Sequence, residues 1–245
     1  MTTEPATIVG HRGARGEAPE NTLAGFQVAR QAGVGEVELD VRLSRDGHLI
    51  VVHDNTVTRT TGERGKVRHY TLEQLAALDA RSNTPGWHHP VGIPSLREVV
   101  AACGAEMRFQ FEVKRAGKIP LHRLARQLIA LIEELGLNSR TVITSSHTGF
   151  LRLIGNQAPH LERGYVSEYR HQQPTRRAVA LGCRWLMPRH TLVNQALMRQ
   201  SRDLGLKVSP WTVNDLTEAE RLLSLGVDSI ITDFPSRFMA HFGNR

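Results

Sequence analysis

The sequence is poor in cysteine and in aromatic residues, and both shortages exclude classes of protein. Only two cysteines, Cys103 and Cys183, occur among 245 residues. Two distant cysteines give neither a disulfide framework nor the ligand spacing of a zinc site, so we expect both to be small buried residues. Aromatic residues make up 5% of the chain, and no Lys/Arg-rich tract or stacking series of aromatics suggests a nucleic-acid partner.

Long apolar runs and a targeting segment are also absent. No apolar run approaches the roughly 20 residues that a membrane-spanning helix needs. The first six residues have neither the basic region nor the apolar region of a secretory signal. We therefore expect a cytoplasmic protein without a membrane anchor, and the sequence indicates no particular oligomeric state.

The charge of the chain is positive but dispersed. Its 31 Lys and Arg residues exceed its 24 Asp and Glu residues, which gives a net charge of +7. Basic residues are mixed with acidic ones along the chain, as a solvated surface requires. A net positive charge of this kind would still assist the capture of a phosphate ester, which is negatively charged.

The most informative stretch runs from Glu36 to Leu43, where charged and apolar residues alternate. A period of two predicts a β-strand, so Glu38 and Asp40 point to the same side. Neighbouring carboxylates repel and resist ionisation. Two interpretations follow: an exposed face of an amphipathic strand with Arg42 as a neutralising neighbour, or a pair of ligands for a divalent cation.

Strand-like and helix-like stretches alternate along the rest of the chain. An Asp46-Gly47 turn predicts a hairpin that pairs residues 49–52 with the acidic strand. Without that hairpin there are eight strands, each followed by a helix, which predicts a TIM (β/α)8 barrel, for which roughly 250 residues is typical. We expect a single domain over residues 1–245 with a small insertion at about 55–94, after the second strand. The eight expected strands cover residues 6–9, 36–43, 107–113, 141–144, 163–166, 184–187, 206–211 and 229–231.

Reactive side chains follow or end several of these strands. In a TIM barrel the chemistry lies at the carboxyl ends of the strands, so residues distant in sequence meet at one mouth. The residues concerned are His11, Arg12, Glu38, Asp40, His53, Glu112, Lys114 and Trp211.

Three of these residues are carboxylates. Taken singly, Glu38, Asp40 and Glu112 would each be an ordinary surface acid. Together around one barrel mouth they are unfavourable without a cation. Oxygen ligands suit Mg²⁺ or Ca²⁺, whereas zinc prefers histidine or cysteine. The sequence therefore predicts one divalent cation, Mg²⁺ or Ca²⁺.

Two histidines and two permanent cations complete the expected site. A lone histidine at a strand end is more often a hydrogen-bonded structural residue than a catalyst. His11 and His53 beside a cation, however, suit acid–base hydrolysis of a phosphodiester, because histidine titrates near neutrality. Arg12 can bind phosphate oxygens bidentately, and Lys114 adds a point charge.

The ordered set of motifs resembles the glycerophosphodiester phosphodiesterase family over nearly the whole chain. The motifs are His11-Arg12-Gly13, Pro19-Glu20-Asn21-Thr22, Glu38-Leu39-Asp40-Val41, Asp46-Gly47, Val52-His53-Asp54, Glu112-Val113-Lys114, Trp211-Thr212-Val213-Asn214 and Thr232-Asp233-Phe234-Pro235.

This resemblance implies a barrel enzyme that hydrolyses glycerophosphodiesters, such as glycerophosphocholine or glycerophosphoethanolamine, to sn-glycerol 3-phosphate and an alcohol. It implies His11 and His53 as the acid–base pair. It implies a metal held by the three carboxylates, phosphate contacts from Arg12 and Lys114, and Trp211 beside the glycerol or the leaving group. Attack by the substrate's own 2-hydroxyl and direct attack by water both stay open.

Other interpretations and departures accompany the resemblance. A lysophospholipase D activity would need an apolar groove at the mouth, and a non-catalytic phosphate-ester binding barrel would lack a histidine or a metal ligand. Glu20, Asn21 and Asp233 are expected to fix loops. His147 stands where the family often has phenylalanine. This difference would either change the leaving-group preference or have no effect.

Overall fold

The protein is a parallel barrel surrounded by helices. The computed structural model describes residues 6–114 and 121–243. Within them, eight strands run parallel, and one short strand, β3, pairs antiparallel with β2. The strands are β1 (Thr7–His11), β2 (Glu36–Leu43), β3 (Leu49–Val51), β4 (Arg108–Val113), β5 (Thr141–Ser145), β6 (Glu162–Ser167), β7 (Trp185–Pro188), β8 (Lys207–Val208) and β9 (Ser229–Thr232).

The parallel strands follow the order β8-β7-β6-β5-β4-β2-β1-β9, so the first and last strands of the chain are neighbours. Strands β8 and β9 meet at the seam of this sheet. There the amide of Asp228 donates to the carbonyl of Val208 at 2.9 Å, and the amide of Ile231 donates to that of Pro210 at 3.0 Å. These bonds bring the two ends of the sheet together, and the expected TIM-barrel architecture is confirmed.

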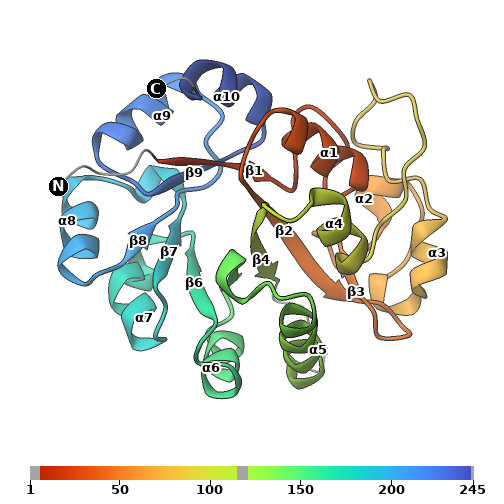
Figure 1. Ribbon diagram of the computed structural model, residues 1–245, viewed down its shortest axis with the longest axis horizontal. Helices are drawn as coiled ribbons and strands as arrows, with labels where there is room; N and C mark the ends of the chain where they lie inside the picture. Colours follow the sequence, from red (N-terminus) through yellow and green to blue (C-terminus); the bar gives the residue numbers. More distant parts are fainter. Residues whose placement is uncertain (1–5, 115–120, 244–245) are drawn as a thin grey trace.

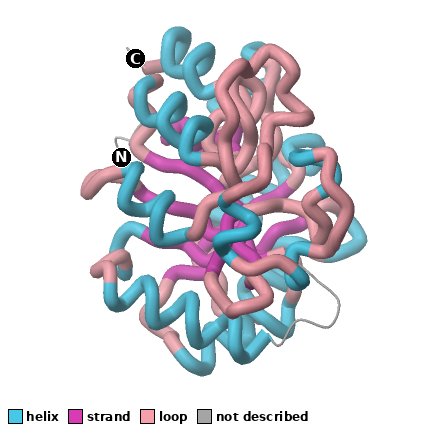
Figure 2. The backbone as a smooth tube through the Cα atoms, turned by 90° about the vertical axis from the view of Figure 1, so that its right-hand side faces the viewer, coloured by secondary structure: helices cyan, strands magenta, loops and turns pink. Residues whose placement is uncertain are grey.

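A helix follows each parallel strand, and the helices enclose the strands (Figures 1 and 2). Thr22 caps α1 and Ser95 caps α4 through side-chain oxygens that accept a backbone N–H, as expected for helix starts. No helix in the described ranges combines the length and the hydropathy needed to cross a bilayer. The helices are α1 (Leu23–Gln31), α4 (Leu96–Cys103), α5 (Leu121–Glu134), α6 (Thr148–Gln157), α7 (Pro174–Ala180), α8 (Gln195–Asp203), α9 (Leu216–Ser224) and α10 (Pro235–Phe242).

Strand β2 is buried along its whole length. It lies between β1 and β4 in the sheet, and all eight of its residues are buried, so neither of its faces meets solvent. Glu38 is 4% exposed and Asp40 is fully buried. The interpretation of this strand as an exposed amphipathic face is therefore wrong. Val37 and Leu39 belong to the hydrophobic core on one face of the strand, and the buried acidic residues lie on the other face.

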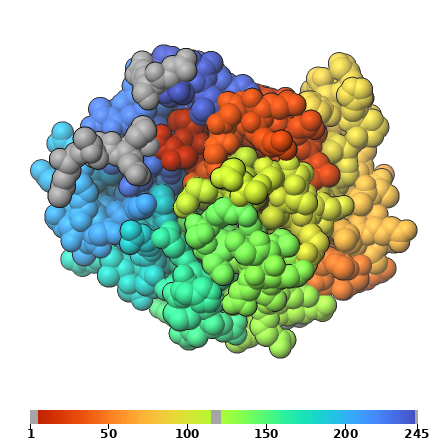
Figure 3. Space-filling view, in the orientation of Figure 1, coloured from red at the N-terminus to blue at the C-terminus, as the bar shows by residue number. Residues whose placement is uncertain are grey.

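Residues between β3 and α4 form a small separate layer at one side of the barrel (Figure 3, yellow and orange). They contain α2 (Thr58–Thr61), the 3-10 turn η1 (Val67–His69) and α3 (Leu72–Ala76). Thr71 as a cap and the residues that follow it predict a short helix over residues 72–78, which the structure shows as α3, ending at Ala76. Neither of the other two elements is predicted, because three or four residues leave no detectable helical period. The buried apolar residues of this layer form a hydrophobic cluster together with Ile50 of β3, and the other members are Val52, Val57, Val67, Leu75, Ala80 and Ile93.

The seventh parallel strand is shorter than expected. The sequence predicts a strand over residues 206–211, but β8 covers only Lys207 and Val208. Pro210 has no N–H for a ladder hydrogen bond, which accounts for the early end of the strand. Trp211 lies three residues beyond β8, where it makes an isolated parallel bridge with Arg189.

The barrel's stability depends on helices packed against the sheet, and a leucine pair tests this. Leu128 in α5 is fully buried, whereas Leu204 after α8 is 43% exposed. We expect Leu128→Ala to lower the free energy of unfolding by about 2–5 kcal/mol. The same substitution at Leu204 should change it by less than about 0.5 kcal/mol. Urea unfolding of both variants measures the difference, and equal losses would contradict this packing.

Candidate active site

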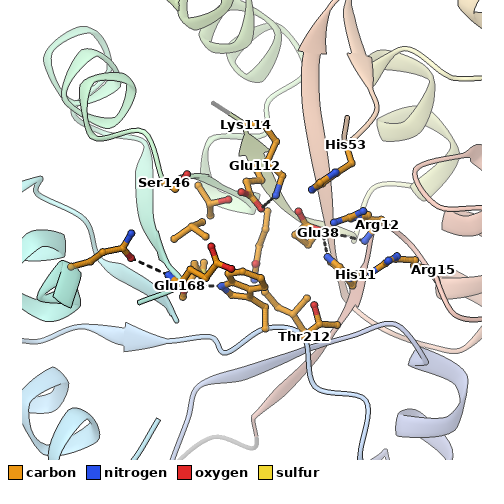
Figure 4. Close-up of a pocket in the computed structure, with 17 residues that line it drawn as sticks. His11, Arg12, Arg15, Glu38, His53, Glu112, Lys114, Ser146, Glu168 and Thr212 are labelled. Atoms are coloured by element: carbon orange, nitrogen blue, oxygen red, sulfur yellow. Dashed lines mark hydrogen bonds and ion pairs between the residues drawn. The ribbon is translucent and has the colours of Figure 1, made fainter. Parts of the chain in front are cut away.

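A cavity of about 500 Å³ opens at the carboxyl ends of the parallel strands (Figure 4). This volume is in the range of small-molecule sites. Its walls bring together seven of the eight reactive residues expected from the sequence, and the eighth, Asp40, lies buried directly behind them. The lining residues are His11, Arg12, Arg15, Glu38, His53, Gln110, Glu112, Lys114, Thr144, Ser146, Val166, Glu168, Gln172, Met187, Trp211, Thr212 and Ile231.

Strand register gathers the three expected carboxylates. Asp40 of β2 is the register partner of Glu112 in β4, and Glu38 lies two residues earlier on the same strand. One carboxylate oxygen from each residue lies within 4.8 Å of the other two. Glu38 and Asp40 are buried and Glu112 is partly buried. Three negative groups at this spacing repel one another strongly in a poorly hydrated site.

Two side-chain cations offset this repulsion. Lys114 Nζ lies 2.7 Å from Glu112 Oε2 and 3.2 Å from Asp40 Oδ1, and Arg12 Nε lies 3.2 Å from Asp40 Oδ2. Burial opposes ionisation of Asp40, but Lys114 and Arg12 hold its pKa well below the usual range. The pKa of Glu38 moves the other way: burial, Asp40 and Glu112 raise it well above its ordinary value.

The carboxylate cluster fits a divalent cation. Glu38 Oε1 is buried and accepts no hydrogen bond from any residue in the described ranges. A buried, unpartnered carboxylate oxygen is costly, and coordination of a cation would satisfy it. The donor set is made entirely of carboxylate oxygens, which suits Mg²⁺ or Ca²⁺ better than zinc.

His11 ends β1 and is held by a carboxylate from the far end of the chain. Its Nδ1 lies 2.6 Å from Asp233 Oδ1, and the other Asp233 oxygen accepts from Asn214 Nδ2 at 2.8 Å. Because the carboxylate accepts from Nδ1–H, Nε2 is left as the basic nitrogen, 3.8 Å from Glu38. Burial lowers the pKa of His11, partly opposed by the hydrogen bond to Asp233.

His53 is held in a similar way by its neighbour in the chain. Its Nδ1 lies 2.6 Å from Asp54 Oδ1, and Asp54 Oδ2 accepts from Arg59 Nε at 2.6 Å. Burial lowers the pKa of His53, although the negative charge of Asp40 opposes this. Both histidines therefore have one nitrogen fixed by an aspartate, while the other has no hydrogen bond to any described residue and can exchange a proton.

Glu20 links the two histidine-bearing loops through arginines. It accepts from Arg12 Nη1 at 2.8 Å and from both terminal nitrogens of Arg59, at 2.6 and 2.8 Å. Arg15 Nε lies 3.4 Å from the same carboxylate. Burial alone would raise the pKa of Glu20, but the hydrogen bonds and charges of Arg59 and Arg12 lower it to about 2. Arg59 thus connects Glu20 with the Asp54–His53 pair.

The loop between β1 and α1 needs an unusual backbone. Arg12 has a φ of +50°, a conformation that costs a non-glycine residue energy and often occurs at functional sites. Its amide donates to Glu38 Oε2 at 3.2 Å. Gly13 follows with a φ of +82°, and a Cβ there would lie 2.7 Å from the backbone of Gly25 in α1. Only glycine allows this close approach, and the resulting loop places Arg12 beside Glu38 and Asp40.

Two further expected residues occupy different positions relative to the cavity. Trp211 lines it and donates its indole N–H to the carbonyl of Met187 at 2.9 Å. His147 is not among the lining residues. Its Nδ1 accepts from the amide of Phe150 at 3.1 Å, which caps the start of α6.

Several contributors to the site could not be assigned from the sequence. Asp233 is expected to fix a turn, yet its carboxylate also holds His11. Asp54 follows His53 directly, and that adjacency is the one available signal for their pairing. Arg15 and Glu168 line the cavity without any motif that distinguishes them from surface residues.

Comparison with known proteins gives a consistent result. The model of the glycerophosphoryl diester phosphodiesterase family matches residues 11–237. A glycerophosphodiester phosphodiesterase of Caldanaerobacter subterraneus subsp. tengcongensis is 35% identical over 93% of this chain and 94% of its own length.

Solved structures agree with this result. A phosphodiesterase of Oleispira antarctica, in complex with the product sn-glycerol-3-phosphate, has a TM-score of 0.88 and 26% identity over 96% of each chain. A glycerophosphodiester phosphodiesterase of Agrobacterium tumefaciens has a TM-score of 0.83 and 26% identity, over 96% of this chain and 99% of its own.

The lowered pKa of Glu20 predicts a pH-dependent contribution to stability. Because the folded pKa of about 2 lies below the ordinary glutamate value of 4.5, this contribution is complete above about pH 5 and declines as the pH falls towards 2. Glu20→Gln should therefore lower the free energy of unfolding at pH 7 by about 3 kcal/mol.

Urea titrations of the wild type and of Glu20→Gln between pH 7 and pH 3 measure this effect. The difference between the two proteins should narrow as the pH falls. A difference that stays constant over this range would show that Glu20 does not change its pKa on folding.

Proposed function

The chain belongs to the glycerophosphoryl diester phosphodiesterase family, whose members hydrolyse glycerophosphodiesters, and we propose how its site carries out that reaction. The proposed products are sn-glycerol 3-phosphate and an alcohol, released with the help of one divalent cation and two histidines. The sn-glycerol-3-phosphate complex of the Oleispira antarctica phosphodiesterase supports this choice of product. The observation that carries the proposal is the convergence of three carboxylates and two aspartate-bound histidines on one cavity.

Glu38, Asp40 and Glu112 would hold Mg²⁺ or Ca²⁺. When bound, the cation supplies neutralisation of the charge that develops on the phosphorus oxygens. Glu38 Oε1 has no hydrogen-bond partner among the described residues, and the pKa of this carboxyl is raised. Both observations support the assignment, because a bound cation would favour the ionised form. Asn21 Nδ2 donates to Asp40 Oδ2 at 2.8 Å and orients this carboxylate from behind.

Lys114 and Arg12 would bind the phosphate. Lys114 reaches the cavity beside Glu112, and its pKa is raised by Asp40 and Glu112 although burial opposes this, so it stays protonated. Arg12 also keeps its charge, because Asp40 and Glu20 outweigh its burial. Glu20 holds the guanidinium from its far side. Both residues therefore present permanent positive charge to a phosphodiester anion.

His11 and His53 would transfer the protons. Burial favours the neutral form of each, and a neutral Nε2 can accept the proton of the attacking hydroxyl. The other histidine, once protonated, donates to the leaving alcohol. Asp233 and Asp54 fix each ring and stabilise its charged form. Direct attack by water requires this pair of proton transfers once. Attack by the substrate's 2-hydroxyl requires it to form a cyclic phosphate, and a second pair follows when water gives up a proton and the 2-oxygen regains one as the ring opens.

Release of glycerol 3-phosphate from glycerophosphodiesters in the presence of Mg²⁺ or Ca²⁺ tests the proposed reaction. Thorough chelation with EDTA should abolish the release, and readdition of the cation should restore it. Binding of a diester without release would indicate a non-catalytic barrel. Full activity after chelation would contradict the metal assignment.

A matched pair of variants locates the cation. Glu112→Gln should weaken binding of the divalent cation roughly tenfold or more, because one of three charged ligands is lost. Glu63→Gln, at an exposed position in the layer between β3 and α4, should bind it as the wild type does. Isothermal titration calorimetry measures both affinities without relying on turnover.

The histidine assignment is tested by single substitutions. His11→Ala and His53→Ala should each lower kcat by ~10²-fold or more while leaving the fold intact. His89→Ala removes an exposed imidazole away from the cavity and should retain full activity. Circular dichroism verifies folding of all three variants. A near-native rate for either site variant would exclude that histidine from proton transfer.

A further inference from the structure

The cavity has two chemically different sides (Figure 4). On one side lie His11, Arg12, Arg15 and His53 with the carboxylate cluster and Lys114. On the other side, Glu168 follows β6 and lies across the cavity from His11 and Arg15. If the phosphate is held on the first side, the cavity leaves room for its leaving-group substituent to extend towards Glu168.

Glu168 brings a free negative charge to that second side. The residue is exposed, and its carboxylate makes no ion pair or hydrogen bond with any residue that the structure describes. It is also outside the group of three carboxylates that lie within 4.8 Å of one another. A charge that neither stabilises the fold nor belongs to the cation cluster is available to a ligand.

The backbone beneath Glu168 is fixed by one glutamine. Gln172 Oε1 accepts three hydrogen bonds, from Ser167 Oγ at 2.8 Å, from the amide of Glu168 at 3.0 Å and from the amide of Tyr169 at 3.2 Å. These three hydrogen bonds connect the end of β6 and the turn after it to one side chain. The backbone that carries the Glu168 side chain is therefore held in place at the rim of the cavity.

Trp211 provides an aromatic surface in the same cavity. Its N–H is already donated to the carbonyl of Met187, so it offers a ligand its ring and no hydrogen bond. The ring is half-buried and packs against a cluster that contains Val166 and Met187, which also line the cavity. A cation beside such a ring is attracted by its negative face.

We propose that Glu168 and Trp211 form a leaving-group subsite that selects alcohols carrying a positive charge, namely quaternary or primary ammonium groups. This inference rests on the proposed function and specifies the substrate class of that site. A carboxylate and an aromatic ring together attract an ammonium group, whereas a neutral polyol gains nothing from the charge. The same carboxylate repels a leaving group that carries a second phosphate or a carboxylate.

A competition assay tests this subsite directly. Glycerophosphocholine and glycerophosphoglycerol share one product, so choline and glycerol released from an equal mixture give the ratio of the two kcat/KM values. The wild type should favour the choline diester. Glu168→Gln keeps the shape of the side chain but removes its charge, and it should lower the choline-to-glycerol ratio about fivefold.

Two controls separate a local effect from a change in overall charge. Asp203→Asn removes an exposed carboxylate on α8, outside the cavity, and should leave the ratio within about twofold of the wild type. Glu168→Lys should lower the ratio below that of Glu168→Gln. Rising salt should reduce the preference of the wild type but not that of Glu168→Gln.

The outcomes separate this inference from the proposed function. An active Glu168→Gln enzyme with an unchanged ratio would overturn the subsite and leave the hydrolase function intact. An equal fall in the rates of both diesters would also overturn it, because Glu168 would then act on steps common to all substrates. Failure of the wild type to release either alcohol would reject the proposed function and the subsite together.

Discussion

Repulsion among three closely spaced carboxylates is the constraint on which the rest of the site depends. Glu38, Asp40 and Glu112 are brought together by the register of β2 and β4, and the first two are buried while Glu112 is partly buried. Lys114 and Arg12 offset part of that repulsion, but Glu38 Oε1 still has no hydrogen-bond donor among the described residues. Such an arrangement lowers the stability of the fold unless a cation binds, so we interpret it as a functional site.

The other charged groups are organised around this cluster through Glu20. Arg12 connects Glu20 with Asp40, while Arg59 connects it with Asp54 and so with His53. Arg59 belongs to the layer between β3 and α4, which thereby contributes to the orientation of His53. This layer has its own hydrophobic cluster and covers one side of the barrel as well as supporting the candidate site.

Much of the fold could be predicted from the sequence, because each parallel strand is a short periodic run followed by an amphipathic helix. The convergence of the candidate site residues on one cavity could also be predicted, since the strand ends of a barrel meet at one mouth. The burial of β2 could not be predicted, because an exposed strand would show the same alternating pattern. The early end of β8 followed from Pro210, whose effect depends on which neighbour its backbone faces.

Residues that act through contacts between distant loops were beyond the sequence. The pairing of His11 with Asp233 spans 222 positions, and Glu168 has no local pattern that sets it apart from a surface acid. Only the closed barrel reveals these neighbours.

The position of a bound cation tests the central claim most directly. Crystals grown with Mn²⁺, which accepts the same oxygen ligands as Mg²⁺ and Ca²⁺, give an anomalous difference map in which the ion is identified by its own signal. We expect one strong peak in contact with carboxylate oxygens of Glu38, Asp40 and Glu112. A map with the ion bound elsewhere, or with no peak among these carboxylates at saturating Mn²⁺, would contradict the claim that the three carboxylates bind a metal ion.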